Sequence, residues 1–418
     1  MTNIAATSPA IEPAPRVRWN WLWSAREDLT WNLLPFWASL ALGIFLLAWW
    51  WIAQFAHWDV RLPEAATQAK ITGIVMYLYG PLIDAPHLWA TISRTYTDAA
   101  EWNERRRLFI GSLVWFVIGP VVILLPYAFT AMALFPAGHE NMGWVLWSQF
   151  FTFYAIFHIN KQHWGFISLY RRKNGEGTAE LDIDRRFYQT AIWLPYAAWL
   201  TAPWYLDFDG APFPLMQAAI GTTTLGNLLH AACHALFIGV CVSYIGYQIL
   251  QWRRGVERNG PKLLYLATVI PIYYLAFTFN PLLAAFWVLL TGPGHCAQYH
   301  KIVWEYGVRK YAAPPEEKRP SLPMRIFGNV WLYVALGVIF GIVTLQGPGS
   351  GIAKNVIAGP LQAGLLLVFP FVGKAVAADV SLKAVAAFIS GVRLHHFYVD
   401  SKIWRVSRNS TLAKNLSV

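Results

Sequence analysis

The chain has 418 residues, of which 56% are hydrophobic, 16% are aromatic and only 13% are charged, and its formal net charge is +11. Soluble globular domains carry about 25% charged residues, so this composition excludes an ordinary soluble domain and favours a membrane protein. The basic residues lie in short connecting segments rather than along one stripe, so the positive charge does not indicate nucleic-acid binding.

Residues 1–32 include polar and Pro-rich stretches and contain Arg16, Arg18 and Arg26. They lack the apolar core that a cleavable signal peptide requires. We therefore predict a cytoplasmic segment over 1–32, a transmembrane helical domain over 33–400 and a cytoplasmic tail over 401–418.

Apolar runs of about 20 residues, long enough to cross a bilayer, recur along the whole chain. They predict spans at 33–53, 71–91, 108–134, 143–168, 188–206, 226–250, 263–280, 282–301, 326–346 and 376–398. A further apolar stretch, 355–373, is an eleventh span, a re-entrant piece or an interfacial helix. The predicted fold is all-α, a polytopic transmembrane bundle of about ten spans.

The charges in the loops predict the orientation of this bundle. The loops after even-numbered spans are basic, as in 101–107, 171–186 and 251–262, whereas those after odd-numbered spans are neutral or acidic, as in 207–213. Cytoplasmic loops of membrane proteins carry an excess of Lys and Arg. Both termini are thus expected in the cytoplasm, and the compartment expected is the bacterial inner membrane.

The three cysteines, Cys233, Cys241 and Cys296, show no CxxC spacing, so neither a disulfide framework nor a zinc finger is expected. Cys296 follows a histidine directly, but a small buried apolar role is favoured over metal binding.

Histidines fall late in four of the spans that run from outside to inside: His87, His158, His163, His295, His300, His395 and His396. Along a helix, His87 lies about 10 Å before Arg94, and His396 about 9 Å before Lys402. The histidines therefore share one depth, toward the cytoplasmic side. Imidazole is costly to bury in hydrocarbon and is a common metal ligand, so this pattern predicts a metal site.

Carboxylates accompany these histidines. Asp84 comes three residues before His87, Asp400 four residues after His396, and Glu305 five residues after His300. We predict Asp84, Asp400 and Glu305 as catalytic groups, either as direct ligands or as partners that orient an imidazole ring. Imidazole with carboxylate suits non-haem iron, zinc or manganese. A two-ion site would use most of these residues, and a one-ion site about four.

Each histidine also has a structural interpretation, as a core residue bonded to a backbone carbonyl. His158 and His163 lie about 140° apart on an ideal helix and cannot face the same way without a bulge. His230 and His234 share a helical face, but His234 lies about 28 Å before Arg253, so this predicted ligand either reaches the same centre or has another role. His57 and His139 fall in external loops and are expected to be solvated.

Aromatic and basic residues alternate at 164–173, 301–311 and 397–406. Anchoring at the membrane interface explains such segments. Alternatively, they roof the site and contact a lipid headgroup or a redox partner.

The segments HINKQH (158–163), HCAQYH (295–300), HAACH (230–234) and RLHHFYVD (393–400) resemble the boxes of the His-box integral membrane iron enzymes, the fatty acid desaturase and hydroxylase class. This resemblance implies two non-haem iron ions on the cytoplasmic side of the membrane. By architecture, the chain also resembles bacterial membrane carotene-cleaving dioxygenases, which hold one iron with four histidines.

The function expected is therefore an oxygen-activating, iron-dependent oxidoreductase that hydroxylates, desaturates or cleaves a hydrophobic, lipid-like substrate. Its expected partners are the lipid bilayer, this substrate and an external electron donor, because the chain shows no nucleotide fingerprint of its own. Two alternatives stay open: a b-type haem electron-transfer protein, and a transporter or proton channel with a histidine relay.

Overall fold

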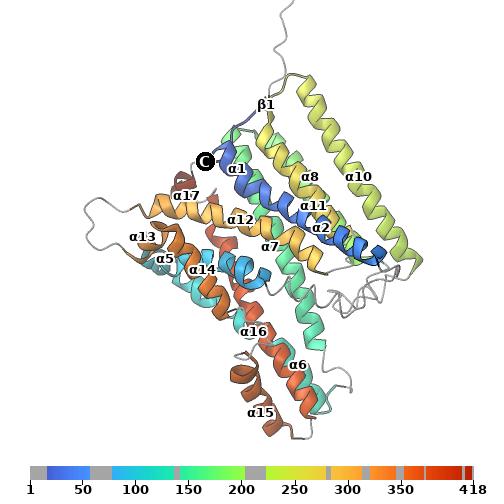
Figure 1. Cartoon of the computed structure of the whole chain (residues 1–418), viewed down its shortest axis with the longest axis vertical. Coiled ribbons are helices and arrows are strands. Elements are labelled where there is room, and N and C mark those ends of the chain that lie inside the picture. The colour runs from blue at the N-terminus through green and yellow to red at the C-terminus, as the bar shows by residue number, and fades with distance from the viewer. Residues whose placement is uncertain are drawn as a thin grey trace, which may run out of the picture.

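The computed structural model of the chain describes residues 17–56, 78–135, 142–202, 223–278, 284–312, 321–344, 353–370, 373–406 and 410–416 (Figure 1). Within these ranges the fold is helical, and the only strands are the two-residue pair β1 (Val17–Arg18) and β2 (Arg258–Asn259). The predicted all-α class is confirmed. The segment 1–16 and two histidines predicted to be solvated, His57 and His139, lie outside the described residues.

The first half of the chain forms α1 (Ala25–Asp28), η1 (Leu29–Leu33), α2 (Leu34–Ala56), η2 (Gly80–Asp84), α4 (Ala85–Thr95), α5 (Ala99–Ser112), α6 (Trp115–Ala131), α7 (Met142–Asn174) and α8 (Thr178–Leu200). The second half forms α10 (Thr224–Arg253), α11 (Gly260–Thr278), α12 (Ala284–Lys310), α13 (Leu322–Phe327), α14 (Val330–Thr344), η4 (Ala353–Ala358), α15 (Gly359–Val368), α16 (Lys374–Ile403) and α17 (Ser410–Leu416). The η elements are single π-helical turns.

The described residues of each predicted apolar run are helical except at two ends, residues 132–134 and Thr201–Ala202, and at two internal breaks. Two runs are interrupted: the run 108–134 is divided between α5 and α6, and the run 326–346 between α13 and α14. The additional stretch 355–373 forms the end of η4 and the short helix α15.

Five helical stretches are long and apolar enough to cross a membrane, judged by length and composition: Ala25–Leu46, Ala99–Ala131, Thr224–Arg253, Gly260–Thr278 and Lys374–Ile403. The helices α7 and α12 are also long, but they contain His, Lys, Arg and Gln side chains, which make them less apolar. The expected total of ten spans and the orientation of the termini stay predictions.

The surface of α10 supports a lipid environment. Its Leu228, Leu236, Val242 and Ile245 side chains are 57–63% exposed, and only 11% of its most apolar window is buried. Soluble monomers rarely expose such a continuous apolar surface. If α10 lies in lipid hydrocarbon, these exposed apolar side chains contact lipid instead of water.

The helices form two groups that α7 and α12 connect. In Figure 1, α8, α10 and α11 lie together on one side, and α6, α15 and α16 lie together on the other. α7 contacts α6 and α16 as well as α8 and α11, while α12 contacts α2, α4 and α11. The four helices that carry the predicted metal ligands of the even-numbered spans, α4, α7, α12 and α16, therefore meet in the interior.

The packing of α16 on α6 depends on Gly391. A Cβ atom there would lie 2.8 Å from the Trp115 carbonyl oxygen and 2.9 Å from the Phe116 Cα atom. The absent side chain lets the two helix backbones approach closely. This contact fixes α16 only five residues before His396.

Candidate metal centre

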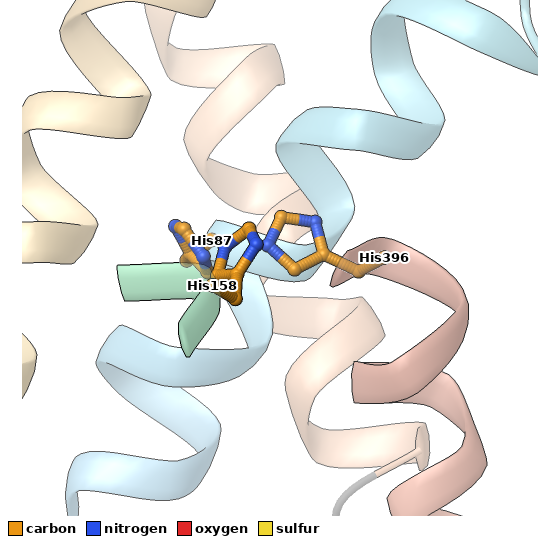
Figure 2. A group of neighbouring side chains, drawn as sticks. All are labelled: His87, His158 and His396. Carbon is orange, nitrogen blue, oxygen red and sulfur yellow. The ribbon is translucent and has the colours of Figure 1, made fainter. Parts of the chain in front are cut away.

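Three buried histidines from three helices bring their ring nitrogens together: His87 of α4, His158 of α7 and His396 of α16. One nitrogen from each ring lies within 4.8 Å of the other two, and Figure 2 shows the rings directed toward one another. Imidazole nitrogen is a common metal ligand. This buried triad could hold a metal ion.

His295 of α12 adds a fourth ring to the group. Its ring centroid lies 4.6 Å from that of His87 and 5.4 Å from that of His158. The His396 ring centroid is 4.5 Å from that of His87 and 5.0 Å from that of His158. His87 and His158 are therefore each close to both other rings. We call His87, His158, His295 and His396 the histidine quartet.

At least one ring nitrogen of each quartet histidine lacks a hydrogen-bond partner among the described residues. Nδ1 and Nε2 of His87, Nε2 of His158, Nδ1 of His295 and Nε2 of His396 are buried and make no hydrogen bond to described residues. A buried polar atom that is left unsatisfied costs about 1–3 kcal/mol. Several such atoms around one point are explained by a cation that accepts their lone pairs.

A hydroxyl and a carboxylate orient His396 from behind. Thr91 Oγ1 lies 2.7 Å from His396 Nδ1 and donates a 2.8 Å hydrogen bond to Asp400 Oδ1. With the hydroxyl proton of Thr91 directed to Asp400, the tautomer that fits is the one in which His396 Nδ1 donates to Thr91 Oγ1. His396 Nε2 then carries the lone pair that faces the quartet, the arrangement typical of metal-bound histidines.

Tyr299 completes this support. Its hydroxyl donates to Asp400 Oδ1 over 2.7 Å and lies 2.6 Å from Thr91 Oγ1, while Trp404 Nε1 donates to it over 3.2 Å. The Tyr299 ring also lies 4.7 Å from the His87 ring. Asp400, predicted as a ligand or an orienting group, therefore lies behind His396, bonded to two hydroxyls.

Two predicted ligands have ring nitrogens that are bonded elsewhere. Nδ1 of His163 lies 2.7 Å from the Tyr265 hydroxyl, and its Nε2 lies 2.8 Å from the Tyr273 hydroxyl. His234 bonds Tyr274 through Nδ1 and His230 through Nε2. The His230–His234 pair is on α10, and no described contact joins it to the quartet.

The other two predicted histidine ligands lie at the edge of the group. His300 Nδ1 is 3.0 Å from the Tyr333 hydroxyl, and its ring centroid is 6.5 Å from that of His87. His395 is adjacent in sequence to His396, but its Nε2 lies 3.1 Å from the Tyr96 hydroxyl.

The remaining two predicted carboxylates form ion pairs. Asp84 accepts a 2.8 Å hydrogen bond from Arg393 Nε. Glu305 accepts a 2.6 Å hydrogen bond from Lys301 and is also paired with Arg309. Neither carboxylate is joined to the quartet by a described hydrogen bond. Cys296 is buried, as expected for an apolar role, and its Sγ atom lies 3.8 Å from the Tyr79 hydroxyl.

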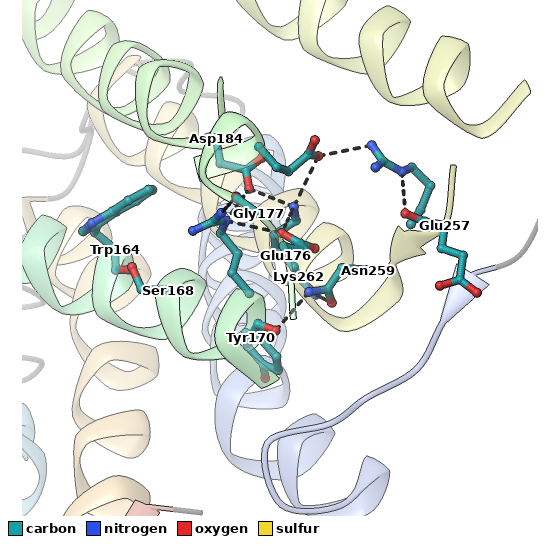
Figure 3. Close-up of polar contacts among 12 residues, drawn as sticks. Trp164, Ser168, Tyr170, Glu176, Gly177, Asp184, Glu257, Asn259 and Lys262 are labelled. Atoms are coloured by element: carbon teal, nitrogen blue, oxygen red, sulfur yellow. Dashed lines mark hydrogen bonds and ion pairs between the residues drawn. The ribbon is translucent and has the colours of Figure 1, made fainter. Parts of the chain in front are cut away.

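A buried ion network holds the end of α7 (Figure 3). Lys262 Nζ lies 2.8 Å from both Glu176 Oε2 and Asp184 Oδ2, and Arg171 Nε lies 3.2 Å from the same Asp184 oxygen. Asp184 is completely buried, and these two cations offset the free-energy cost of burying its carboxylate. The network joins α7, α8 and α11, and it fixes the helix that carries His158.

A cavity of about 800 Å³ leads to this group from the molecular surface. His158, Phe397, Tyr299 and Asp400 line it together with residues of the aromatic and basic segments 164–173 and 397–406. Its volume lies within the range of about 300–1,000 Å³ that is typical of ligand pockets. The cavity gives a small molecule access to one side of the quartet.

Thr91, Tyr299 and this cavity were not predicted from the sequence. Thr91 does lie four residues after His87, on the same face of α4, so helical spacing offered one weak signal. No protein-family model, curated protein or solved structure matches this chain.

Proposed function

We propose that the chain is a membrane metalloenzyme that binds one iron ion through the histidine quartet and uses dioxygen to oxidise a hydrophobic substrate. The observation that carries this proposal is the set of buried, unpartnered ring nitrogens on four helices. One ion is proposed because, among the described residues, only His87, His158 and His396 bring three such ligand atoms within 4.8 Å of one another, with the His295 ring beside them. The proposal is therefore for one iron ion instead of the two that the sequence resemblance implies.

The ligand chemistry favours a divalent transition metal. Neutral imidazole suits iron, zinc and copper, whereas magnesium and calcium prefer oxygen ligands. When bound, iron would supply the one-electron chemistry that dioxygen activation requires. The protein would hold the rings in position, through Thr91 behind His396, and would exclude bulk water with apolar helices.

The surroundings of the metal centre support a hydrophobic substrate. The cavity that reaches His158 is lined mainly by apolar and aromatic side chains, which suits a lipid-like substrate. The described residues contain no nucleotide-binding loop, so reducing equivalents would come from an external electron donor. Hydroxylation, desaturation and cleavage are all compatible with this site.

We also propose ten membrane crossings, with both termini and the metal centre on the cytoplasmic side of a bacterial inner membrane. The alternation of basic and neutral loops supports this topology. Cysteine accessibility can test it: single cysteines in the basic segments 101–107, which the structure places within α5, and 251–262 should react with impermeant reagents only after the cytoplasmic face is opened.

Metal analysis of the purified full chain tests the central proposal. We expect about one iron per chain in the wild type, with no Soret band of haem. His396→Ala should lose the metal, whereas His395→Ala should retain it, because the neighbouring ring bonds Tyr96 instead. Wild-type protein without stoichiometric metal would refute the proposal, and so would retention of metal by His396→Ala. A Soret band would favour the haem alternative.

A further inference from the structure

The cavity that reaches the quartet has two chemically different ends. Its inner part is formed by buried or half-buried groups such as His158, Phe166, Tyr299 and Phe397. Its outer part is formed by exposed basic side chains: Lys161, Arg172, Arg185 and Arg405. The cavity thus runs from a cationic rim to an apolar interior.

Among the described residues, no carboxylate neutralises the positive charge of the rim. Arg172 and Arg185 form no ion pair with described residues. Arg405 donates to the Ser401 carbonyl, and Lys161 lies 5.2 Å from the centroid of the Phe157 ring. By contrast, Arg171, which also lines the cavity, is paired with Asp184 and Glu176.

Asp400 is the only carboxylate among the described residues that line the cavity, and it lies at the inner end. Its Oδ1 atom is bonded to Thr91 and Tyr299, so it does not approach the rim cations. An anionic group placed at the inner end would meet this carboxylate, whereas the same group at the rim beside Arg172 and Arg185 would meet cations. The charges therefore define one orientation for a bound anion.

Aromatic and aliphatic side chains contribute to the cavity wall. Phe157, Trp164, Leu169 and Trp404 also line the cavity. An apolar chain placed along this wall would gain about 25 cal/mol for each Å² of surface removed from water. Such a wall would not favour a ligand that is polar throughout.

We propose that this cavity binds an amphiphile whose anionic head group is held by Arg172 and Arg185, which directly follow the ion-paired Arg171 and Asp184 in the chain, and whose apolar chain points inward to His158. This inference deepens the proposed function, since the chain end would be the part presented to the metal centre. The binding itself depends on the cavity and its rim and needs no bound metal. The head group is an anionic oxygen group, a carboxylate or a phosphate.

Photo-crosslinking on the purified full chain in a neutral detergent tests this proposal. The probe is a long-chain fatty acid with a diazirine at the chain end, and crosslinked peptides are identified by mass spectrometry. We expect labels on α7, α12 or α16 near His158, Tyr299 and Phe397. Arg172→Gln/Arg185→Gln should lower the yield at least about tenfold, because hydrogen bonds to charged groups are strong. Arg172→Lys/Arg185→Lys should keep most of it.

Two controls separate charge recognition from general effects. Arg106→Gln/Arg107→Gln removes two exposed arginines from α5, which does not line the cavity, and should leave the yield unchanged. A methyl ester of the same probe should label wild type weakly and should not respond to the Arg172/Arg185 substitutions. Equal labelling by acid and ester would overturn the proposal, as would labelling that is confined to other helices.

Competition distinguishes the two sources of the head group. If oleate displaces the probe and a lysophospholipid with a phosphate head does not, the ligand is a free fatty acid. If only the lysophospholipid displaces the probe, the ligand is a phospholipid. The assay uses neither turnover nor metal. Protein treated with a chelator should therefore give the same labelling, and a failure of the iron proposal would not be mistaken for a failure of this one.

Discussion

Thr91 Oγ1 lies 2.7 Å from Nδ1 of His396 and donates a 2.8 Å hydrogen bond to Oδ1 of Asp400. One hydroxyl therefore links a carboxylate to a ring of the histidine quartet. The three residues come from α4 and α16, which are far apart in the chain. Such outer partners fix the tautomer and the direction of a metal-bound ring.

Replacing Thr91 by valine should therefore weaken metal binding. Thr91→Val keeps the shape of the side chain but removes the hydroxyl, and loss of such a partner typically lowers metal affinity about 10–100-fold. Thr91→Ser should restore affinity close to the wild-type value. Competition with a calibrated chelator measures the change. Equal affinity in all three proteins would show that the hydroxyl does not orient the ring.

Gly391 is expected to control the position of His396 through helix packing. Gly391→Ala would place a Cβ atom 2.8 Å from the Trp115 carbonyl and force α16 away from α6. Overpacking of this kind typically costs about 1–3 kcal/mol. We expect a lower thermal midpoint and a lower metal content.

Gly246→Ala is the matched control for that substitution. Gly246 lies inside α10, and a Cβ atom there would meet no heavy atom within 4 Å. Since alanine favours helix over glycine by up to about 1 kcal/mol, stability should be unchanged or slightly higher. If both variants behaved alike, close packing at Gly391 would not be the cause.

Much of the fold could be predicted because apolar runs and their polar punctuation are local features of the sequence. The division of 108–134 at Leu113 and Val114 could not, because these residues are as apolar as their neighbours. Directly after the break, Trp115 and Phe116 pack against Gly391 of α16, a tertiary contact that no local pattern records.

The site was predictable as a region but not residue by residue. Equal depth indicated that histidines from several helices would gather. However, neighbouring residues such as His395 and His396 point about 100° apart, and sequence alone cannot say which of them faces inward. The angle of about 140° between His158 and His163 argued against their facing the same way, yet both were predicted as ligands; in the structure His158 joins the triad and His163 bonds Tyr265.

The pH dependence of stability should reveal the ion pair between Asp98 and Lys310, which lies outside the predicted spans. Burial alone would raise the pKa of Asp98, but hydrogen bonds from Lys310 and Tyr311 outweigh it and lower that pKa below the usual 3.8. A carboxyl group with a lowered pKa stabilises the fold above its unfolded pKa, and this contribution is lost as the pH falls through the folded value.

Asp98→Asn should thus be less stable than wild type at pH 7, and the difference should shrink as the pH falls below about 4. Thermal unfolding of both proteins across this range measures it. Glu104→Gln, which changes an exposed carboxylate of α5, is the control and should show little difference at any pH. A difference between wild type and Asp98→Asn that does not depend on pH would exclude the ion pair as its source.

His163 should act in stability rather than in metal binding, although it lies five residues from His158. Both of its ring nitrogens are bonded to tyrosines of α11, and its side chain is completely buried. His163→Ala would leave the hydroxyls of Tyr265 and Tyr273 with fewer partners and would open a cavity, so we expect the free energy of unfolding to fall by about 2–4 kcal/mol.

His158→Ala should show the opposite pattern, with metal lost and the α7–α11 contact kept. Iron content and thermal midpoint measured on both variants separate the two roles. Loss of iron from His163→Ala at a temperature where the variant is still folded would bring His163 back into the ligand set.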